Sequence, residues 1–219
     1  MAVLYSYIKS NRMRRKSVWY FLFTFIFLGL KQASGELRLE HQAALEMLSY
    51  PDITQGIIDL LYMDIEYLWH QGAYERIFPI YRIITTIGPN DVEAWAVGGW
   101  FLINGVAPIY SREERQQIER YGIKFIKKGI EKNPEDARLY WELSWIFYSK
   151  GDFDRSLEYL QKAEKYPHDF KVEHLKAHIY MKKNMKNEAI NEWQKISEKY
   201  PENKHIADRF IRQIKQDSN

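Results

Sequence analysis

Apolar residues recur along this chain at helical spacing, in runs that start after a turn and stop at a proline. The turns lie at residues 72–74, 151–153 and 184–186, and the prolines that end the runs are Pro89, Pro167 and Pro201. The first two turns read Gly-x-aromatic and the third is a degenerate copy, and each turn begins 16 or 17 residues before its proline. This fixed spacing predicts stacked helical hairpins, because one such hairpin cannot bury its apolar face alone.

The clearest of these units spans residues 137–169. Its first helix carries an aromatic residue, a leucine, a small residue and a second aromatic residue in turn: Tyr140, Leu143, Ser144 and Phe147. Its second helix has a small-large-small face: Ser156, Leu160 and Ala163. Small residues let two helix backbones approach, and large ones fill the gaps between them. The pattern resembles the tetratricopeptide repeat, in which aromatic-x2-Leu-Gly-x2-Tyr is followed by Ala-x3-Phe, Ala and a closing Pro.

The resemblance extends over residues 58–203. This stretch divides into four units, which span residues 58–91, 92–136, 137–169 and 170–203. The last unit departs from the repeat at Glu173 and Lys176, where an aromatic residue and a leucine would stand. This departure predicts a first helix that is rotated or partly exposed.

The flanking segments also fit an array of helices. Residues 36–57 read as an N-terminal helix (36–49) and a linker, and residues 204–219 as a capping helix with an apolar stripe and a tail. The resemblance therefore implies an all-α fold, a right-handed α-α superhelix of TPR-like hairpins with about ten helices over residues 36–219.

The second unit is about 11 residues longer than a repeat of 34. The extra residues lie near 104–118, where Asn104–Tyr110 reads as a loop broken by Pro108. Ser111-x-x-Glu114 then predicts a capping box at the start of a long helix. A long connection in a repeat array is either a tolerated surface insertion or part of a binding face, and both interpretations stay open.

The first 35 residues form a hydrophobic leader. An apolar run of 13 residues, Val18–Leu30, follows a basic cluster at residues 12–16 and precedes the small residues Ala33-Ser34-Gly35. This is the pattern of a signal peptide, and an uncleaved signal anchor is the alternative. Either one keeps the positive residues in the cytoplasm and exports the C-terminal body. We therefore expect a periplasmic or cell-envelope protein, with a membrane contact through this segment if it is not cleaved. Leader and repeats together resemble a bacterial-envelope TPR protein.

Composition excludes several classes of function. There is no cysteine, which excludes disulfides, thiolate metal sites and cysteine nucleophiles. The leader holds six basic residues and no acidic one, so the rest of the chain carries 26 basic and 29 acidic residues, a net charge of −3. Nucleic acid is therefore not an expected partner. No nucleophile elbow, phosphate-binding glycine loop or catalytic carboxylate pair is found, so we expect no catalytic residues, no cofactor and no small-molecule substrate.

In the family that the repeats resemble, the first helices line a concave groove. The groove positions of the four units map onto Tyr62, Trp69, Trp100, Trp141, Trp145, Tyr148, His174 and His178, and the same register adds Glu66, Ala96, Ile103 and Met181. The aromatic residues either form a binding surface or pack into the core. His174 and His178 share one helix face at a spacing that can bind metal, but no third ligand is apparent. We therefore predict a polar groove wall and no metal site.

Three functions remain after these exclusions. The leading hypothesis is a non-catalytic adaptor or scaffold, exported or anchored, that binds a peptide or protein partner in the aromatic groove. The first alternative is a fixed structural subunit of a larger envelope assembly, in which the aromatic surface is permanently covered. The second alternative is an unrecognised enzyme that uses the insertion together with His174 and His178.

Overall fold

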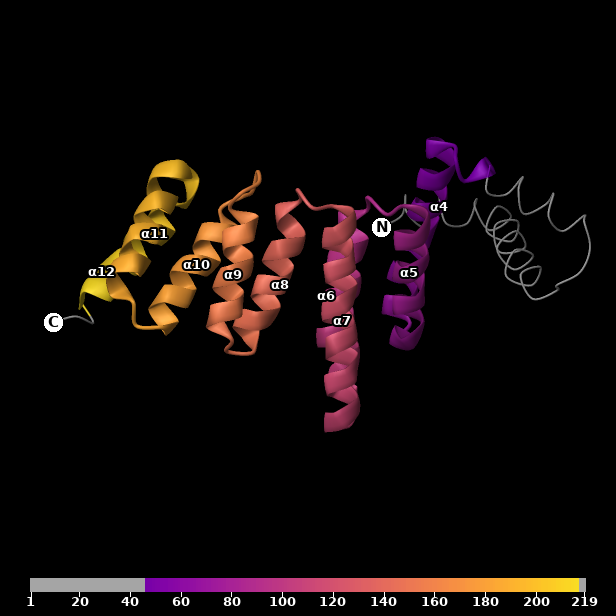
Figure 1. Cartoon of the computed structure of the whole chain (residues 1–219), viewed down its shortest axis with the longest axis horizontal. Helices are drawn as coiled ribbons and strands as arrows, with labels where there is room; N and C mark the ends of the chain where they lie inside the picture. Colours follow the sequence, from indigo (N-terminus) through magenta and orange to yellow (C-terminus); the bar gives the residue numbers. More distant parts are fainter. Residues whose placement is uncertain (1–45, 217–219) are drawn as a thin grey trace, which may run out of the picture. The chain divides into compact units, whose positions relative to one another are not determined.

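The computed structural model describes residues 46–216, and every regular element within that range is a helix (Figure 1). The elements are α4 (Pro51–His70), η1 (Tyr74–Arg76), α5 (Ile77–Ile87), α6 (Val92–Phe101), η2 (Leu102–Val106), η3 (Ala107–Ile109), α7 (Arg112–Lys132), α8 (Ala137–Ser149), α9 (Phe153–Ala163), α10 (Lys171–Lys182), α11 (Lys186–Lys199), η4 (Pro201–Asn203) and α12 (Lys204–Gln216). This confirms the predicted all-α fold of helical hairpins. The leader and most of the helix predicted over residues 36–49 lie outside the described residues.

The chain divides into two compact units, residues 1–54 and 55–219. In the first unit the described residues form a short turn and the start of α4. There the Ser49 hydroxyl donates to the Glu46 carbonyl (2.6 Å) and the Thr54 hydroxyl to the Leu48 carbonyl (2.8 Å). The second unit contains the array, in which α6 pairs with α7, α8 with α9 and α10 with α11, while α12 packs on α11.

The turns inside the hairpins show why the sequence repeats there. Gly72 (φ 69°) and Gly151 (φ 75°) both adopt the left-handed conformation, which costs a glycine little. Asn184 occupies the same place in the degenerate third turn with φ 58°. Asparagine is one of the few other residues that adopts this conformation readily, so the third turn keeps the geometry without the glycine.

Small residues bring α8 and α9 together, as the repeat pattern predicts. Ser144 and Ser156 are fully buried, and their hydroxyl oxygens lie 2.8 Å apart. Either hydroxyl donates in that contact, and the Ser156 hydroxyl also reaches the Ser144 carbonyl at 2.8 Å. Aspartates cap both helices: Asp136 accepts from the Arg138 N–H (2.8 Å) and Asp152 from the Arg155 N–H (3.1 Å).

Glycines have the same role between α6 and α7. A Cβ atom added at Gly99 would lie 2.3 Å from the Ile126 Cγ1 atom, and one added at Gly129 would lie 2.6 Å from the Trp95 Cβ atom. Neither contact is possible for a real side chain, so these backbones lie closer than any other residue permits. Trp95 fills the space beside Gly129 and is fixed there by its indole N–H, which donates to the Pro89 carbonyl at 2.9 Å.

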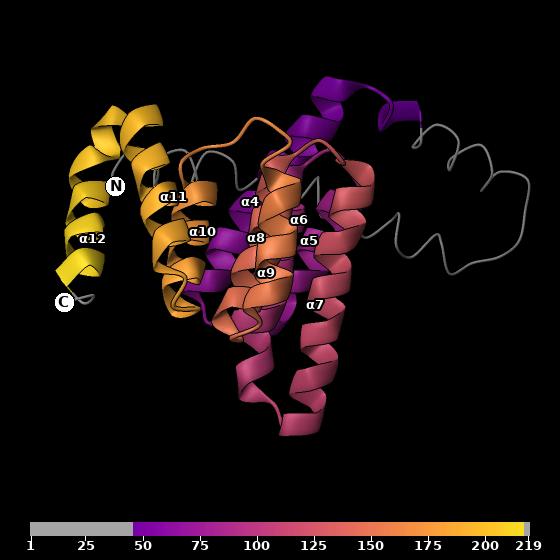
Figure 2. The ribbon, with the colours of Figure 1, turned by 60° about the vertical axis from the view of Figure 1, so that its left-hand side comes forward.

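The loop predicted over Asn104–Tyr110 is wrong. The chain stays helical through a π-helical turn, η2, and a 3-10 turn, η3, before α7 begins. Burial explains the difference, because Leu102, Ile103 and Ala107 are buried and hold this stretch against α7. The capping box is confirmed, with Ser111 and Glu114 each accepting from the other's backbone N–H. The extra residues thus lengthen the α6–α7 hairpin, which extends past its neighbours in Figure 2.

The segment Val92–Ile109 is the one described stretch that is long and apolar enough to cross a membrane by length and composition. Half of it is buried inside the protein. Ala94, Trp95 and Phe101 from this segment belong to a core cluster shared with α4, α5, α7 and α8. Core packing therefore accounts for its apolar character.

The exposure predicted as one possibility for the first helix of the last unit is wrong at the two residues that suggested it. Glu173 and Lys176 are both buried in α10. The Lys176 ammonium group lies 2.6 Å from a Glu164 carboxylate oxygen of the preceding hairpin and 3.3 Å from one of Glu192 in α11. Burial alone would lower the pKa of Lys176, but these two carboxylates raise it above its ordinary value. A buried ion pair thus replaces the leucine.

Aromatic rings hold the last three helices together. Trp193 in α11 is fully buried and stacks on Phe210 in α12, with ring centroids 4.4 Å apart. His174 and His178 from α10 meet the Trp193 ring edge-on at 5.3 and 5.2 Å. Burial, and secondarily the neighbouring His174, lowers the pKa of His178 to about 4. Burial also lowers the pKa of His174, so both imidazoles are neutral at neutral pH.

We expect Gly129→Ala to destabilise the protein, because the new methyl group collides with Trp95. Overpacking of this kind costs about 1–3 kcal/mol, part of which is offset by the better helix propensity of alanine. The matched control is Gly56→Ala in α4, where the added Cβ meets no side chain and no other segment of the described chain within 4 Å, chain neighbours aside. That change should stabilise the helix by about 0.5–1 kcal/mol. Urea denaturation measures both, and equal effects at the two sites would contradict the close crossing of α6 and α7.

We expect His178 to make stability fall as the pH is lowered. Its folded-state pKa of about 4 lies below the ordinary histidine value of about 6.5. Between these two values the unfolded chain binds a proton that the folded protein does not, so stability is complete above about pH 6.5 and declines toward about pH 4. The His178→Phe variant keeps an aromatic ring and should show a shallower decline. Urea denaturation at several pH values tests this, and parallel profiles would refute it.

Candidate functional site

The candidate site is a row of aromatic rings on α8. Trp141, Trp145 and Tyr148 are spaced four and three residues apart, so they share one face of the helix. The Trp141 and Trp145 rings stack with centroids 5.9 Å apart and planes 13° from parallel. Tyr148 lies 5.5 Å from Trp145 and 5.8 Å from Phe153 at the start of α9. We call these four residues the aromatic row.

Trp141 is held in place before any ligand arrives. Its indole N–H donates to the Lys171 carbonyl at 3.1 Å, which ties α8 to the first residue of α10. The Lys171 ammonium group lies 6.0 Å from the Trp141 ring centroid, within the range of a cation-π contact. A cavity of about 210 Å³ opens beside this tryptophan, with Arg138 and Val172 among the residues that line it. The ring is thus a fixed wall of a small hollow.

Two further predicted positions are exposed aromatic residues on neighbouring first helices. Trp69 on α4, Trp100 on α6 and Trp145 on α8 retain 47%, 38% and 39% of their accessible surface. Trp69 packs edge-on against Tyr74 (5.1 Å) and Phe101 (6.2 Å), which leaves one side of its ring open. Single exposed apolar side chains are normal on a protein surface, whereas exposed aromatic rings that gather on one surface mark a binding site.

Tyr62 has a structural role in addition to its predicted groove position. Its hydroxyl donates to an Asp91 carboxylate oxygen at 2.9 Å, and the same oxygen accepts from the Ala94 N–H at 2.9 Å as the cap of α6. Burial raises the pKa of Tyr62 well above its ordinary value, and the bonded Asp91 adds to the shift. Tyr62 therefore stays protonated and joins α4 to the start of α6.

The remaining predicted positions lie in different environments. Ala96 and Ile103 are buried in the core, so the groove register that placed them on an open surface is wrong at these two positions. His174 and His178 pack on Trp193, as described above, and thus face an aromatic cluster. Within residues 46–216 no three His, Asp or Glu side chains gather as a metal site requires.

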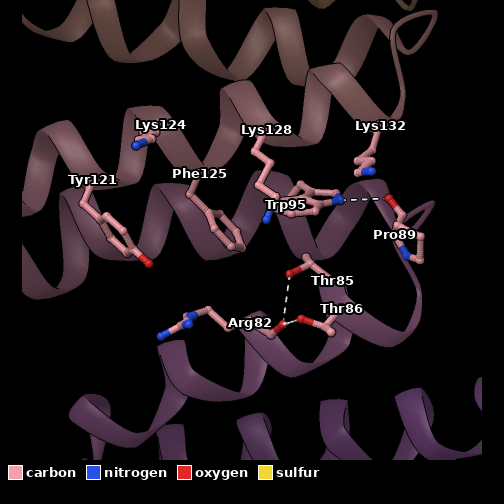
Figure 3. Close-up of a pocket in the computed structure, with 10 residues that line it drawn as sticks. All are labelled: Arg82, Thr85, Thr86, Pro89, Trp95, Tyr121, Lys124, Phe125, Lys128 and Lys132. Atoms are coloured by element: carbon pink, nitrogen blue, oxygen red, sulfur yellow. Dashed lines mark hydrogen bonds between the residues drawn. The ribbon is translucent and has the colours of Figure 1, made fainter. Parts of the chain in front are cut away.

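A second hollow was not predicted from the sequence. A cavity of about 460 Å³ lies between α5 and α7, and Trp95 is one of its lining residues (Figure 3). Three of its lining residues are lysines on one face of α7: Lys124, Lys128 and Lys132. Their four-residue spacing was the signal that could have revealed it, because such residues lie above one another on a helix.

Comparison with known proteins identifies the repeat. Residues 137–167 match the family model described as tetratricopeptide repeat. The chain is similar in structure to a thermophilic TPR protein from Thermus thermophilus, with 16% identity, a TM-score of 0.57 and coverage of 79% of this chain and 94% of the other. It also matches MamA from Desulfovibrio magneticus, with 20% identity, a TM-score of 0.47 and coverage of 64% and 74%. A comparison with curated proteins finds no match.

These comparisons agree with the geometry. The matched segment begins at the first residue of α8 and ends at Pro167, after α9, which is the hairpin with the buried serine contact. The Thermus protein shares the arrangement of helices over most of this chain. Residues 137–167 are therefore a tetratricopeptide repeat, and the array as a whole has the fold of tetratricopeptide repeat proteins.

Proposed function

We propose that this protein is an adaptor that binds a peptide or a protein partner on the first helices of its array. The fold supports protein interaction as the general role, and folds of this kind are typically non-catalytic. The observation that carries the proposal is the aromatic row, together with the exposed rings of Trp69 and Trp100. Within the row Trp145 is exposed, and Trp141, Tyr148 and Phe153 are half-buried. Tryptophan and tyrosine are among the residues that most often dominate binding energy at interfaces.

The contacts of Trp141 support a binding role for its ring. The ring is oriented by the hydrogen bond to Lys171 and by its stack on Trp145. A side chain that is already fixed loses little conformational entropy when a partner covers it, so more of its contact energy becomes affinity. The adjoining cavity of about 210 Å³ is large enough to accept a side chain of the partner.

A fixed structural subunit is the alternative, because a permanent partner would cover the same rings. The two differ in solution: an adaptor stays monomeric and soluble without its partner, whereas an obligate subunit aggregates or copurifies with its assembly. An enzyme based on residues 104–118 and the two histidines has less support. The histidine rings pack on Trp193, and the insertion forms helical turns and the start of α7.

We further propose that the adaptor acts outside the cytoplasm, as an exported periplasmic or cell-envelope protein. The support is the leader in residues 1–35, with its basic cluster and its apolar run of 13 residues. Fractionation of cells that express the full chain should place it in the periplasm or the membrane. N-terminal sequencing of the mature protein separates a cleaved signal from an anchor. Recovery in the cytoplasm alone would refute the export.

The groove is tested by alanine substitution at Trp100, Trp141 and Trp145, with Trp95 and Trp193 as controls. If the first three bind a partner recovered from native membranes, each change should weaken binding by about 1–2 kcal/mol and leave most of the stability intact. Truncation of the buried Trp95 or Trp193 should instead cost about 3–5 kcal/mol of folding free energy. Melting and binding are measured on the same variants. Equal destabilisation at all five tryptophans would remove the case for a binding surface.

A further inference from the structure

The cavity between α5 and α7 is surrounded by positive charge. Arg82 from α5 and Lys124, Lys128 and Lys132 from α7 line it, and none of its lining residues is acidic (Figure 3). We call these four side chains the basic rim. In the described residues none of the four forms an ion pair.

Several other lysines of the same array are paired. Lys150 reaches Glu119 at 2.5 Å, Lys162 reaches Glu158 at 2.6 Å, and Lys199 reaches Glu173 at 2.7 Å. The basic rim is a local concentration of positive charge around one hollow, in a body whose net charge is negative once the leader is set aside. Four uncompensated cations around one hollow repel one another and create a local positive potential that attracts an anion.

The floor of the cavity is apolar and rigid. Trp95 and Phe125 are only 2% and 8% exposed, and their ring centroids lie 4.6 Å apart. Tyr121 is exposed at one end, and Phe78 lies edge-on to both Tyr121 and Phe125 at 5.8 and 5.2 Å. An apolar floor below a charged rim is the lining expected for a ligand that carries both negative charge and an apolar group.

The spacing of the lysines distinguishes a linear anion from a compact one. Successive lysines are four residues apart on α7, or about 6 Å along the helix axis, so the three span about 12 Å. Alternate residues of an extended peptide are about 6.5–7 Å apart and point to the same side. A single phosphate would need its donors to converge on one point, whereas this row matches acidic side chains at every second position.

We propose that this cavity binds an extended acidic segment of a partner protein. The carboxylates of the bound segment form ion pairs with Lys124, Lys128 and Lys132. An apolar side chain of the segment, located between two of these carboxylates, packs against Trp95 and Phe125. A nucleic acid strand fits less well, because those two rings are too buried to stack with bases and the negative body repels a polyanion. The basic rim shares no residue with the aromatic row, so this site does not depend on the adaptor surface proposed above.

The test uses the full-length protein in mild non-ionic detergent and a fluorescein-labelled peptide with the sequence Glu-Leu-Glu-Phe-Glu-Leu-Glu. Fluorescence anisotropy should report saturable binding that weakens when the salt concentration rises from about 0.05 to about 0.5 M. The K128Q variant should weaken binding about threefold, and K124Q/K128Q/K132Q together about tenfold or more. The same peptide with glutamine in place of glutamate should not bind.

The matched control is K127Q, the neighbouring exposed lysine of α7 that does not line the cavity. It removes the same charge from the same helix, and it should leave the affinity unchanged. Equal weakening by K127Q and K128Q would overturn the proposal, because binding would then reflect net charge alone. Absence of binding at about 1 mM peptide would also overturn it. Tighter binding of a labelled oligothymidine or of tripolyphosphate, lost in the same lysine variants, would assign the site to phosphates and refute an acidic peptide.

Discussion

Two helices can cross closely only where at least one of the two residues that meet at the crossing is small, and the array depends on this condition. It is met by Ser144 and Ser156 between α8 and α9 and by Gly99 and Gly129 between α6 and α7. Since the small residues occupy the inner faces, the large rings at other positions of the first helices are directed elsewhere. Trp95 is a large residue at such a crossing, and it fits beside Gly129 only because that residue has no side chain. The close crossings thus determine which aromatic residues become core and which become surface.

The last hairpin departs from the repeat by burying charged residues. Lys176 and Glu173 are buried where the repeat has apolar residues, and each joins α10 to a neighbouring element: Lys176 to Glu164 and Glu192, Glu173 to Lys199 and His168. Burial would raise the pKa of Glu173, but the bonds from Lys199 and His168 outweigh it and hold that pKa below its ordinary value. Buried pairs of this kind add little net stability over apolar residues, yet removal of one partner leaves an uncompensated charge. The pairs therefore favour this one alignment of α10 over others.

Local signals in the sequence were sufficient to predict most of the helices. The turn spacing, the prolines and the small residues predicted the hairpins, and Ser111 with Glu114 predicted the start of α7. The predictions were wrong where tertiary contacts determine the local conformation. The stretch Asn104–Tyr110 looks like a loop from its Gly and Pro, but burial of Leu102, Ile103 and Ala107 keeps it helical. Trp100 and Trp145 are exposed at positions that the repeat register placed on the groove, whereas Trp141 is half-buried against a core cluster. The cavity between α5 and α7 could not be predicted in this way, because it joins residues about 40 apart in the chain.

The two candidate surfaces use different chemistry on different helices. The aromatic row lies on α8 and the start of α9 and offers rigid apolar area, while the basic rim lies on α5 and α7 and offers charge around a narrow apolar floor. Trp95 belongs to the first helix of its own hairpin but forms the floor beneath the basic rim, so one glycine-dependent crossing supports the second surface. The surfaces share no side chain, so neither proposal depends on a residue that the other uses. If both proposals hold, the array carries two binding surfaces on one rigid chain, which is the physical requirement for a scaffold as distinct from a simple receptor.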